Sequence, residues 1–119
     1  MSCPDFISLT LAVRTAAHLA HLTSRSYAQH MALGGFYDAL VPLVDKYAEV
    51  YTGIEGKIPN YPKAKALDYD DPVELVGDYL TLVRDETKED EHGSQALLNI
   101  LAELEELTAQ TLYKLKFLK

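Results

Sequence analysis

The amino-acid sequence predicts an all-α protein, a four-helix bundle in which two helical hairpins are joined by one long crossover. Apolar residues recur at three- and four-residue intervals in four segments of the chain. Two connections between these segments are short, whereas the middle one is long and contains two prolines. With 119 residues, 48% of them hydrophobic, the chain is long enough to bury a core as a single domain over 1–119.

The first segment opens at residues 3–5 and carries an apolar stripe over about 18 residues. A cluster of small polar residues at 23–26 ends it. Within that cluster, Ser26 and Gln29 have the spacing of a capping box, which predicts the start of a second helix.

The second helix is predicted from about Tyr27 to Thr52, with Gly53 as its C-terminal stop. It contains two faults. The pair Gly34-Gly35 weakens a helix by about 1 kcal/mol per glycine relative to alanine, and Pro42 removes a backbone hydrogen bond and bends it. Either fault is a candidate for a break.

The third helix has the clearest start in the chain. The periodicity dissolves over residues 54–70, which predicts a crossover between parallel or distant helices. Asp71 then serves as N-cap, Pro72 takes the first helical position and Glu74 the capping-box position. These signals predict a helix over 72–88.

The fourth helix follows a short acidic connection at 88–93, in which His92 is predicted to be an exposed loop residue. Its apolar stripe forms part of the core. The stripe consists of Leu97, Ile100, Leu101, Leu104, Leu107, Thr108 and Leu112. A hairpin, a long crossover and a second hairpin is the connectivity of ferritin-like bundles, so the sequence predicts that fold.

Charge and composition argue against DNA binding, membrane binding and secretion. The net charge is −7, with 18 acidic and 11 basic residues, so phosphate backbones and anionic membranes are repelled. The single cysteine, Cys3, cannot form an internal disulfide, the N-terminus lacks a signal-peptide pattern, and no apolar run approaches the roughly 20 residues that span a bilayer. We therefore expect a cytoplasmic protein that binds neither DNA nor membrane.

The residues that suggest chemistry lie in the first hairpin. Three of the four histidines, His18, His21 and His30, flank its turn. If the turn centres near residue 24, His18 and His30 are equidistant from it, and their imidazoles lie side by side. Which of His18 and His21 points to the site depends on a rotation of the first helix by one turn.

Two carboxylates complete the set. Asp45 and Glu49 are four residues apart and share a helix face, and imidazole and carboxylate together suit iron, manganese or zinc. His30 and Asp45 are about 22 Å apart at roughly 1.5 Å per residue. One chain therefore cannot bring both pairs to one ion, and a two-fold dimer with antiparallel hairpins would form two equivalent sites.

At these positions the sequence resembles the Dps family, the miniferritins or DNA-binding proteins from starved cells. His18, His30, Asp45 and Glu49 have the spacing of that family's ferroxidase ligands. The likeness extends over roughly residues 8 to 118. It includes Leu33, Gly35-Phe36, Ala39-Leu40 and 45–49 in the second helix, and Tyr79 and 89–104 beyond it.

The resemblance implies an intersubunit iron site that oxidises Fe(II), often with hydrogen peroxide, in dimers that commonly build hollow dodecamers. His18 and His30 of one chain would face Asp45 and Glu49 of its mate, with Glu49 bridging or chelating iron and Asp45 completing the ligand set. His21 has no counterpart in the family pattern and would support the ligands from one turn away.

Three features depart from the family pattern. Leu19 stands where the family usually has tryptophan, no basic residue precedes Arg14, and Pro42 lies in the helix of the carboxylates. DNA binding through a lysine-rich arm is therefore not implied.

Two other interpretations remain open. The histidines can be hydrogen-bonded core or interface residues, and the eight tyrosines are typical of interface packing. The chain would then be a ferritin-like interaction module without metal chemistry, of phage or mobile-element origin. No nucleophile elbow or phosphate loop supports a hydrolase or a nucleotide-binding protein.

Overall fold

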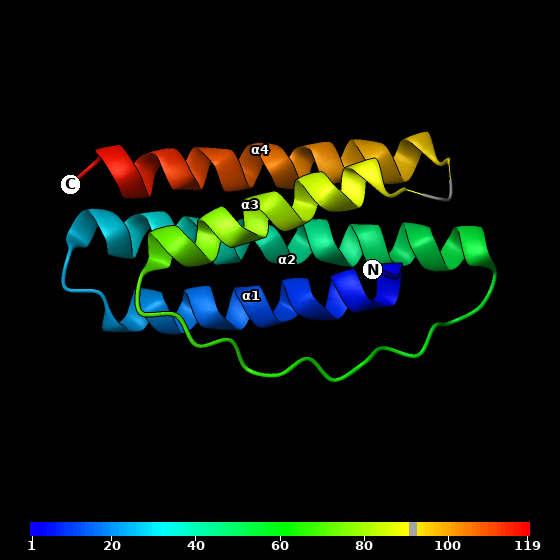
Figure 1. Ribbon diagram of the computed structural model, residues 1–119, viewed down its shortest axis with the longest axis horizontal. Helices are drawn as coiled ribbons and strands as arrows, with labels where there is room; N and C mark the ends of the chain where they lie inside the picture. Colours follow the sequence, from blue (N-terminus) through cyan, green and yellow to red (C-terminus); the bar gives the residue numbers. More distant parts are fainter. Residues whose placement is uncertain (91–92) are drawn as a thin grey trace.

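The computed structural model describes residues 1–90 and 93–119. Over these residues it holds four α-helices (Figure 1). They are α1 (Cys3–Thr23), α2 (Tyr27–Glu55), α3 (Pro72–Lys88) and α4 (Gln95–Phe117). This confirms the prediction of an all-α four-helix bundle. The expected loop position of His92 lies outside the described residues.

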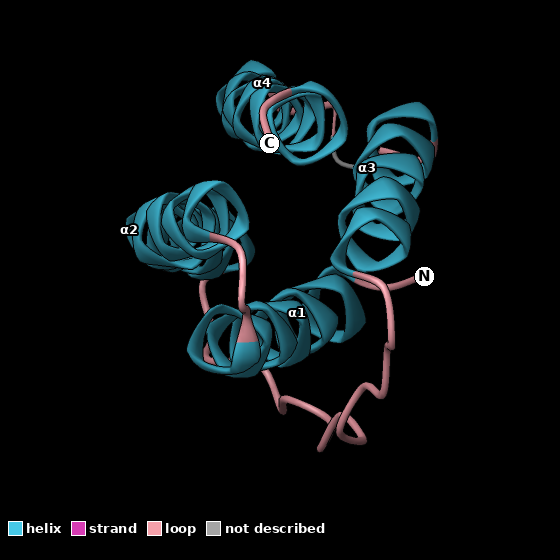
Figure 2. Cartoon of the chain, turned by 90° about the vertical axis from the view of Figure 1, so that its left-hand side faces the viewer, coloured by secondary structure: helices cyan, strands magenta, loops and turns pink. Residues whose placement is uncertain are grey.

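The helices form two antiparallel hairpins, α1 with α2 and α3 with α4 (Figure 1). The long connection from α2 to α3 runs back along the bundle, so these two helices point in the same direction, as the crossover predicted. Seen end-on, α1 packs against α2 and α3, and α4 closes the ring by packing against the same two helices (Figure 2). The crossover lies outside α1.

Each helix starts at a side-chain cap. Ser26 accepts a hydrogen bond from the backbone N–H of Gln29, as the capping-box spacing predicted, and Asp71 accepts one from Val73. Ser2 and Ser94 cap α1 and α4 in the same way. Capping satisfies amide groups that have no partner inside the helix. The bounds of α3 therefore agree with the predicted 72–88.

The predicted end of the second helix was wrong by one turn. The helix α2 continues through Gly53 to Glu55, and Gly56 caps it in the left-handed conformation, with φ of 77° and its N–H bonded to the Thr52 carbonyl. Only a glycine takes that conformation at low cost. Neither Pro42 nor the two glycines breaks the helix.

An aromatic group joins three helices in the core. The Phe6 ring of α1 contacts the rings of Tyr47 in α2 and Tyr79 in α3. The Tyr47 hydroxyl is 3.4 Å from the Cys3 sulfur, and the Tyr79 hydroxyl is 2.9 Å from Thr10 Oγ1. Burial raises the pKa of both phenols, so both stay protonated in the folded chain.

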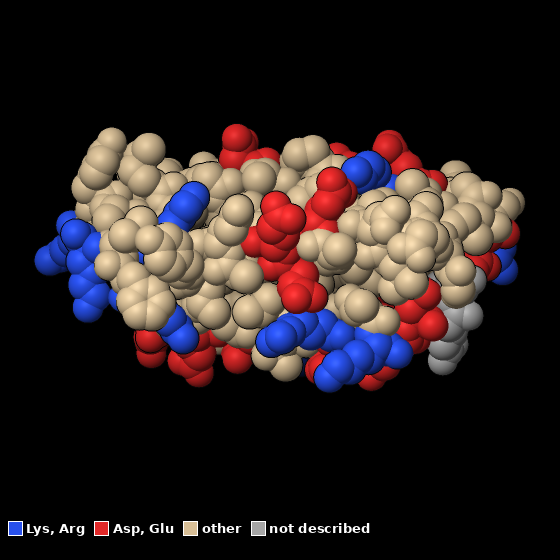
Figure 3. All heavy atoms as spheres, turned by 90° about the horizontal axis from the view of Figure 1, so that it is seen from above, with Lys and Arg blue, Asp and Glu red and all other residues tan. Residues whose placement is uncertain are grey.

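The surface of the bundle carries charges of both signs. Seen from the side of α3 and α4, carboxylates gather near the middle, with basic side chains beside them and at the ends (Figure 3). Within the part of the chain that the structure describes, no helix is long and apolar enough to cross a membrane.

Candidate functional site

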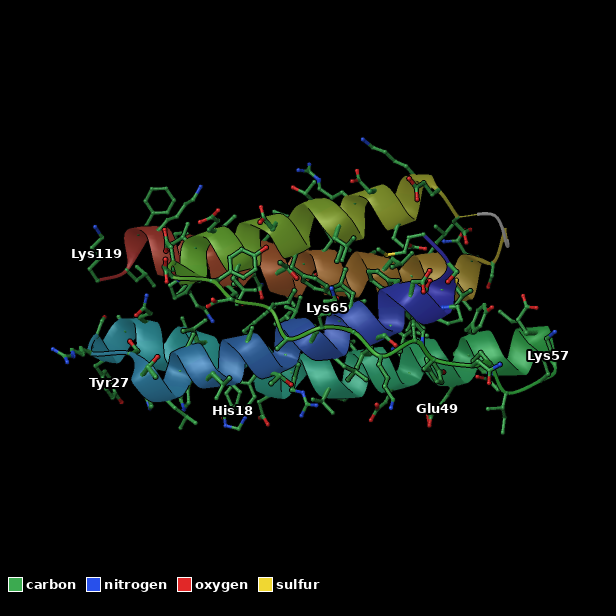
Figure 4. The ribbon with its side chains drawn as sticks, turned by 60° about the horizontal axis from the view of Figure 1, so that its bottom comes forward. His18, Tyr27, Glu49, Lys57, Lys65 and Lys119 are labelled. Atoms are coloured by element: carbon green, nitrogen blue, oxygen red, sulfur yellow. The ribbon has the colours of Figure 1, made fainter. Side chains whose placement is uncertain are left out.

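One face of α2 in the first hairpin is exposed along its whole length. Its exposed residues follow each other at alternating intervals of four and three, which places them in one stripe. This stripe, called here the outer face, consists of Met31, Gly35, Asp38, Pro42, Asp45 and Glu49. The side chains of His18 and Glu49 lie on the same side of the hairpin, turned away from α3 and α4 (Figure 4).

His21 of α1 and His30 of α2 form a reciprocal pair. Their rings stack with centroids 3.7 Å apart and planes 18° from parallel. The Nδ1 atom of His21 is 2.6 Å from the carbonyl oxygen of His30, and the Nδ1 atom of His30 is 2.8 Å from the carbonyl oxygen of His21. A carbonyl oxygen only accepts, so each Nδ1 carries the hydrogen. Each neutral ring then keeps its lone pair on Nε2.

Gly34 makes room for this pair. A Cβ atom at Gly34 would lie 2.9 Å from Cε1 and 3.0 Å from Nδ1 of His21, closer than a side chain tolerates. A Cβ atom at Gly35 would meet nothing within 4 Å. Sequence reasoning treated both glycines only as faults in the helix, because the residue opposite a helical glycine is set by the tertiary structure.

His18 lies on the other side of the same cluster. Its ring stacks on Tyr37 of α2 at 4.1 Å and 14°, while the Tyr37 ring meets His21 edge-on at 5.4 Å. The rings of His18 and His21 are 6.2 Å apart. Sequence reasoning favoured interface packing for the tyrosines, Tyr37 among them, and no sequence signal places Tyr37 against imidazoles.

The expectation that His18 lies beside His30 is therefore corrected: His21 takes that position. The turn occupies residues 24–26 and centres on residue 25, later than the assumed centre at 24. A later centre moves the position opposite His30 along α1 from His18 toward His21. The open question of helix rotation is thus decided in favour of His21 as the partner of His30.

Asp45 and Glu49 are both exposed on the outer face, one turn apart. The ion pairs between described residues do not include either carboxylate, whereas the neighbouring Lys46 pairs with Glu103 at 2.9 Å. Among the described residues, no group of three or more His, Cys, Asp or Glu side chains is arranged to hold a metal ion. Imidazoles and carboxylates thus remain at separate levels of the hairpin in one chain, as their spacing requires.

The fold and this face define a four-helix bundle with an imidazole pair and a carboxylate pair on its first hairpin. The sequence model of a family of unknown function (DUF5856) matches residues 21–115, and the chain belongs to that family. The matched range begins at His21, so it includes His30, Asp45 and Glu49 and leaves out His18.

The chain is also similar to a phage protein. It is 34% identical over 68 residues to the "Uncharacterized 14.6 kDa protein in mobD-ri intergenic region" of Enterobacteria phage T4. The aligned part is 56% of this chain and 53% of the phage protein, so the chain spans about half of that protein's length. No solved structure matches.

Proposed function

We propose that the protein binds and oxidises ferrous iron at a site shared by two copies of the chain, in the manner of the miniferritins that it resembles. The reciprocal pair of His21 and His30 carries this proposal. An imidazole that binds a metal through one nitrogen commonly donates its other N–H to a backbone carbonyl, which fixes the tautomer and the ring orientation. Both rings have that arrangement, with Nε2 left as the ligand atom.

The remaining ligands come from the second copy in this proposal. Asp45 lies about 22 Å and Glu49 about 28 Å along α2 from His30, at roughly 1.5 Å per residue. A two-fold dimer through the outer face brings the imidazoles of one copy to the carboxylates of its mate, and it does so twice. Iron is the substrate, and it suits mixed nitrogen and oxygen ligands.

Each part of such a site has a role in the oxidation. Hydrogen peroxide is the oxidant that the resemblance implies: two Fe(II) ions give it one electron each, and with two protons it becomes two water molecules, which leaves two Fe(III) ions. The negative charges of Asp45 and Glu49 stabilise the ferric product. In this scheme His21 replaces His18 of the family pattern, and His18 packs beside it on Tyr37.

The proposal includes a ferritin-like bundle and a homo-oligomer. The crossover between two helices that run in the same direction supports the ferritin-like connectivity (Figure 1). A dimer is the smallest assembly that completes the site, and the dodecamer is the assembly that the resemblance implies.

The test measures Fe(II) oxidation and bound iron in four variants. The double variant Asp45→Ala with Glu49→Ala should lose oxidation while its helical content is unchanged, because both side chains are exposed. His21→Ala and His30→Ala should also lose it. His18→Ala is the matched control and should keep most of the activity. Full oxidation by the double variant would rule the assignment out.

A second candidate function is a ferritin-like interaction module without metal chemistry. The similarity over 68 residues to an uncharacterized phage T4 protein favours it, together with the departures from the miniferritin pattern at Leu19 and Pro42. Mass in solution and elemental analysis, before and after anaerobic Fe(II) addition, separate the two. A metal-free dimer that ignores Fe(II) supports the module, and iron in an even-numbered assembly supports the oxidase.

A further inference from the structure

Arg14 of α1 has a buried donor without a partner. Its Nε is the buried side-chain nitrogen or oxygen atom that lacks a hydrogen bond among the described residues. A buried guanidinium donor without an acceptor lowers the stability of the folded chain, so we expect an acceptor for this atom in the assembled protein. Arg14, His18 and His21 follow each other at intervals of four and three, so all three project from one stripe of α1.

The ring contacts of the first hairpin show which residues of α2 lie opposite Arg14. The contacting pairs His21–His30 and His18–Tyr37 have residue numbers that add up to 51 and 55. In an antiparallel hairpin this sum is nearly constant, so subtracting 14 places Arg14 opposite residues 37 to 41 of α2. Asp38 lies at this level, on the exposed outer face.

In the proposed dimer, the two-fold axis passes close to residues 37 to 41 of α2, which lie opposite Arg14. If His30 of one copy faces the middle of Asp45 and Glu49 of its mate, the two-fold axis crosses α2 halfway between residues 30 and 47. That point lies between residues 38 and 39. Arg14 and Asp38 therefore both lie beside the axis, where each meets the other copy.

We propose that Arg14 pairs with Asp38 of the partner subunit, and that the two equivalent pairs fix the register of the dimer. This inference rests on the dimer of the proposed function. A carboxylate is the acceptor that matches a guanidinium, because it takes two parallel N–H groups. Asp38 forms no ion pair with any described residue. Charge complementarity near the axis supports a second copy as the occupant, because the guanidinium of Arg14 in one chain faces the carboxylate of Asp38 in the other.

Charge reversal tests the pairing without iron. Arg14→Asp and Asp38→Arg should each raise the dimer dissociation constant by about tenfold or more, because each homodimer then holds like charges at both contacts. An equimolar mixture of the two variants should dimerise again. In the heterodimer every contact joins one Asp to one Arg, which an ion pair within one chain cannot reproduce. Sedimentation of the two variants, alone and mixed, gives these constants.

Two sets of control variants test whether the effect is specific to Arg14 and Asp38 and whether the fold is retained. Arg84→Asp and Glu105→Arg reverse charges that are 4.0 Å apart on the second hairpin, and they should leave the dimer unchanged. If a reversal lowers the helical content, Arg14→Gln and Asp38→Asn replace it and should weaken the dimer in the same direction. A mixture that dimerises no better than its components, or single variants as tight as the natural chain, would overturn the pairing.

The outcome is separable from the proposed function. Restored heterodimers of a chain that never binds iron would leave the pairing standing and end the oxidase proposal. Iron oxidation by a dimer that is insensitive to both reversals would end the pairing and leave the oxidase proposal standing.

Discussion

The two hairpins of the bundle differ in the kind of contact that joins their two helices. Between α3 and α4 the core contacts are apolar, with residues such as Val83, Leu101 and Leu104 fully buried, and the ion pair of Arg84 with Glu105 lies at the surface. The buried hydroxyl of Thr108 bonds to the Leu104 carbonyl within its own helix, at 2.6 Å. Between α1 and α2, by contrast, two imidazoles bond to backbone carbonyls of the opposite helix. In the first hairpin, therefore, side chains of each helix bond to the backbone of the other, in addition to the apolar packing that both hairpins share.

The buried leucines of the two hairpins should nevertheless contribute equally to the free energy of unfolding. Leu40 of α2 and Leu101 of α4 are both 0% exposed. Leu40→Ala and Leu101→Ala should each lower the free energy of unfolding by about 3 kcal/mol, through lost burial and a remaining cavity. Asp45→Ala on the outer face should change it by less than about 0.5 kcal/mol. Urea denaturation measures all three, and a cost at Asp45 close to that of the leucines would contradict the separation of faces.

The buried phenols give a second comparison, because Tyr47 belongs to the first hairpin and Tyr79 to the second. Burial raises the pKa of both, and an unfolded tyrosine ionises near pH 10. Above that pH the unfolded chain loses protons that the folded chain keeps. Stability is thus complete below about pH 10 and should fall above it by about 1.4 kcal/mol per pH unit for each phenol.

Unfolding at several alkaline pH values, with Tyr79→Phe and Tyr47→Phe, checks this slope. Each substitution should remove the contribution of one phenol to the slope of the unfolding free energy against pH. In the first hairpin the loss should begin earlier, because burial also raises the pKa of the Cys3 thiol beside Tyr47, and an unfolded thiol ionises near pH 8.5. Equal slopes in the natural chain and in both variants would refute the assignment.

The smallest expected effect compares two adjacent glycines. Gly35→Ala should raise the free energy of unfolding by up to about 1 kcal/mol, because alanine favours an exposed helix and meets no atom there. Gly34→Ala should lower it instead, because its Cβ displaces the His21 ring and breaks the bond to the His30 carbonyl. Thermal unfolding with imidazole proton spectra tests the pair. Equal gains at both positions would show that the ring moves aside freely.

Local signals predicted most of the fold. Asp71 and Pro72 fixed the start of α3 because a capping side chain and a ring locked near helical φ act within a few residues. The end of α2 was not predictable in the same way. Gly53 and Gly56 are equally good stops by residue type, and only the conformation of Gly56 in the folded chain distinguishes them. Pro42 lies in a continuous helix because packing on both sides of it outweighs one lost hydrogen bond.

The candidate site was predictable by residue type but not by pairing. The spacing of His30, Asp45 and Glu49 placed them on one helix and separated the carboxylates from the imidazole. The partner of His30 depended on where the turn centres, since a small shift exchanges His18 for His21. Arg14 carried no signal at all in the sequence, because an unpaired buried donor exists only once its neighbours are placed.

The sequence by itself determined the four helices, their order and the residues that face the core, because helix periodicity and caps are local properties of the chain. Only the tertiary structure decided which imidazoles meet, why Gly34 has no side chain and where Arg14 lies. These depend on the register between two helices, and that register is set by side chains packing across the whole hairpin.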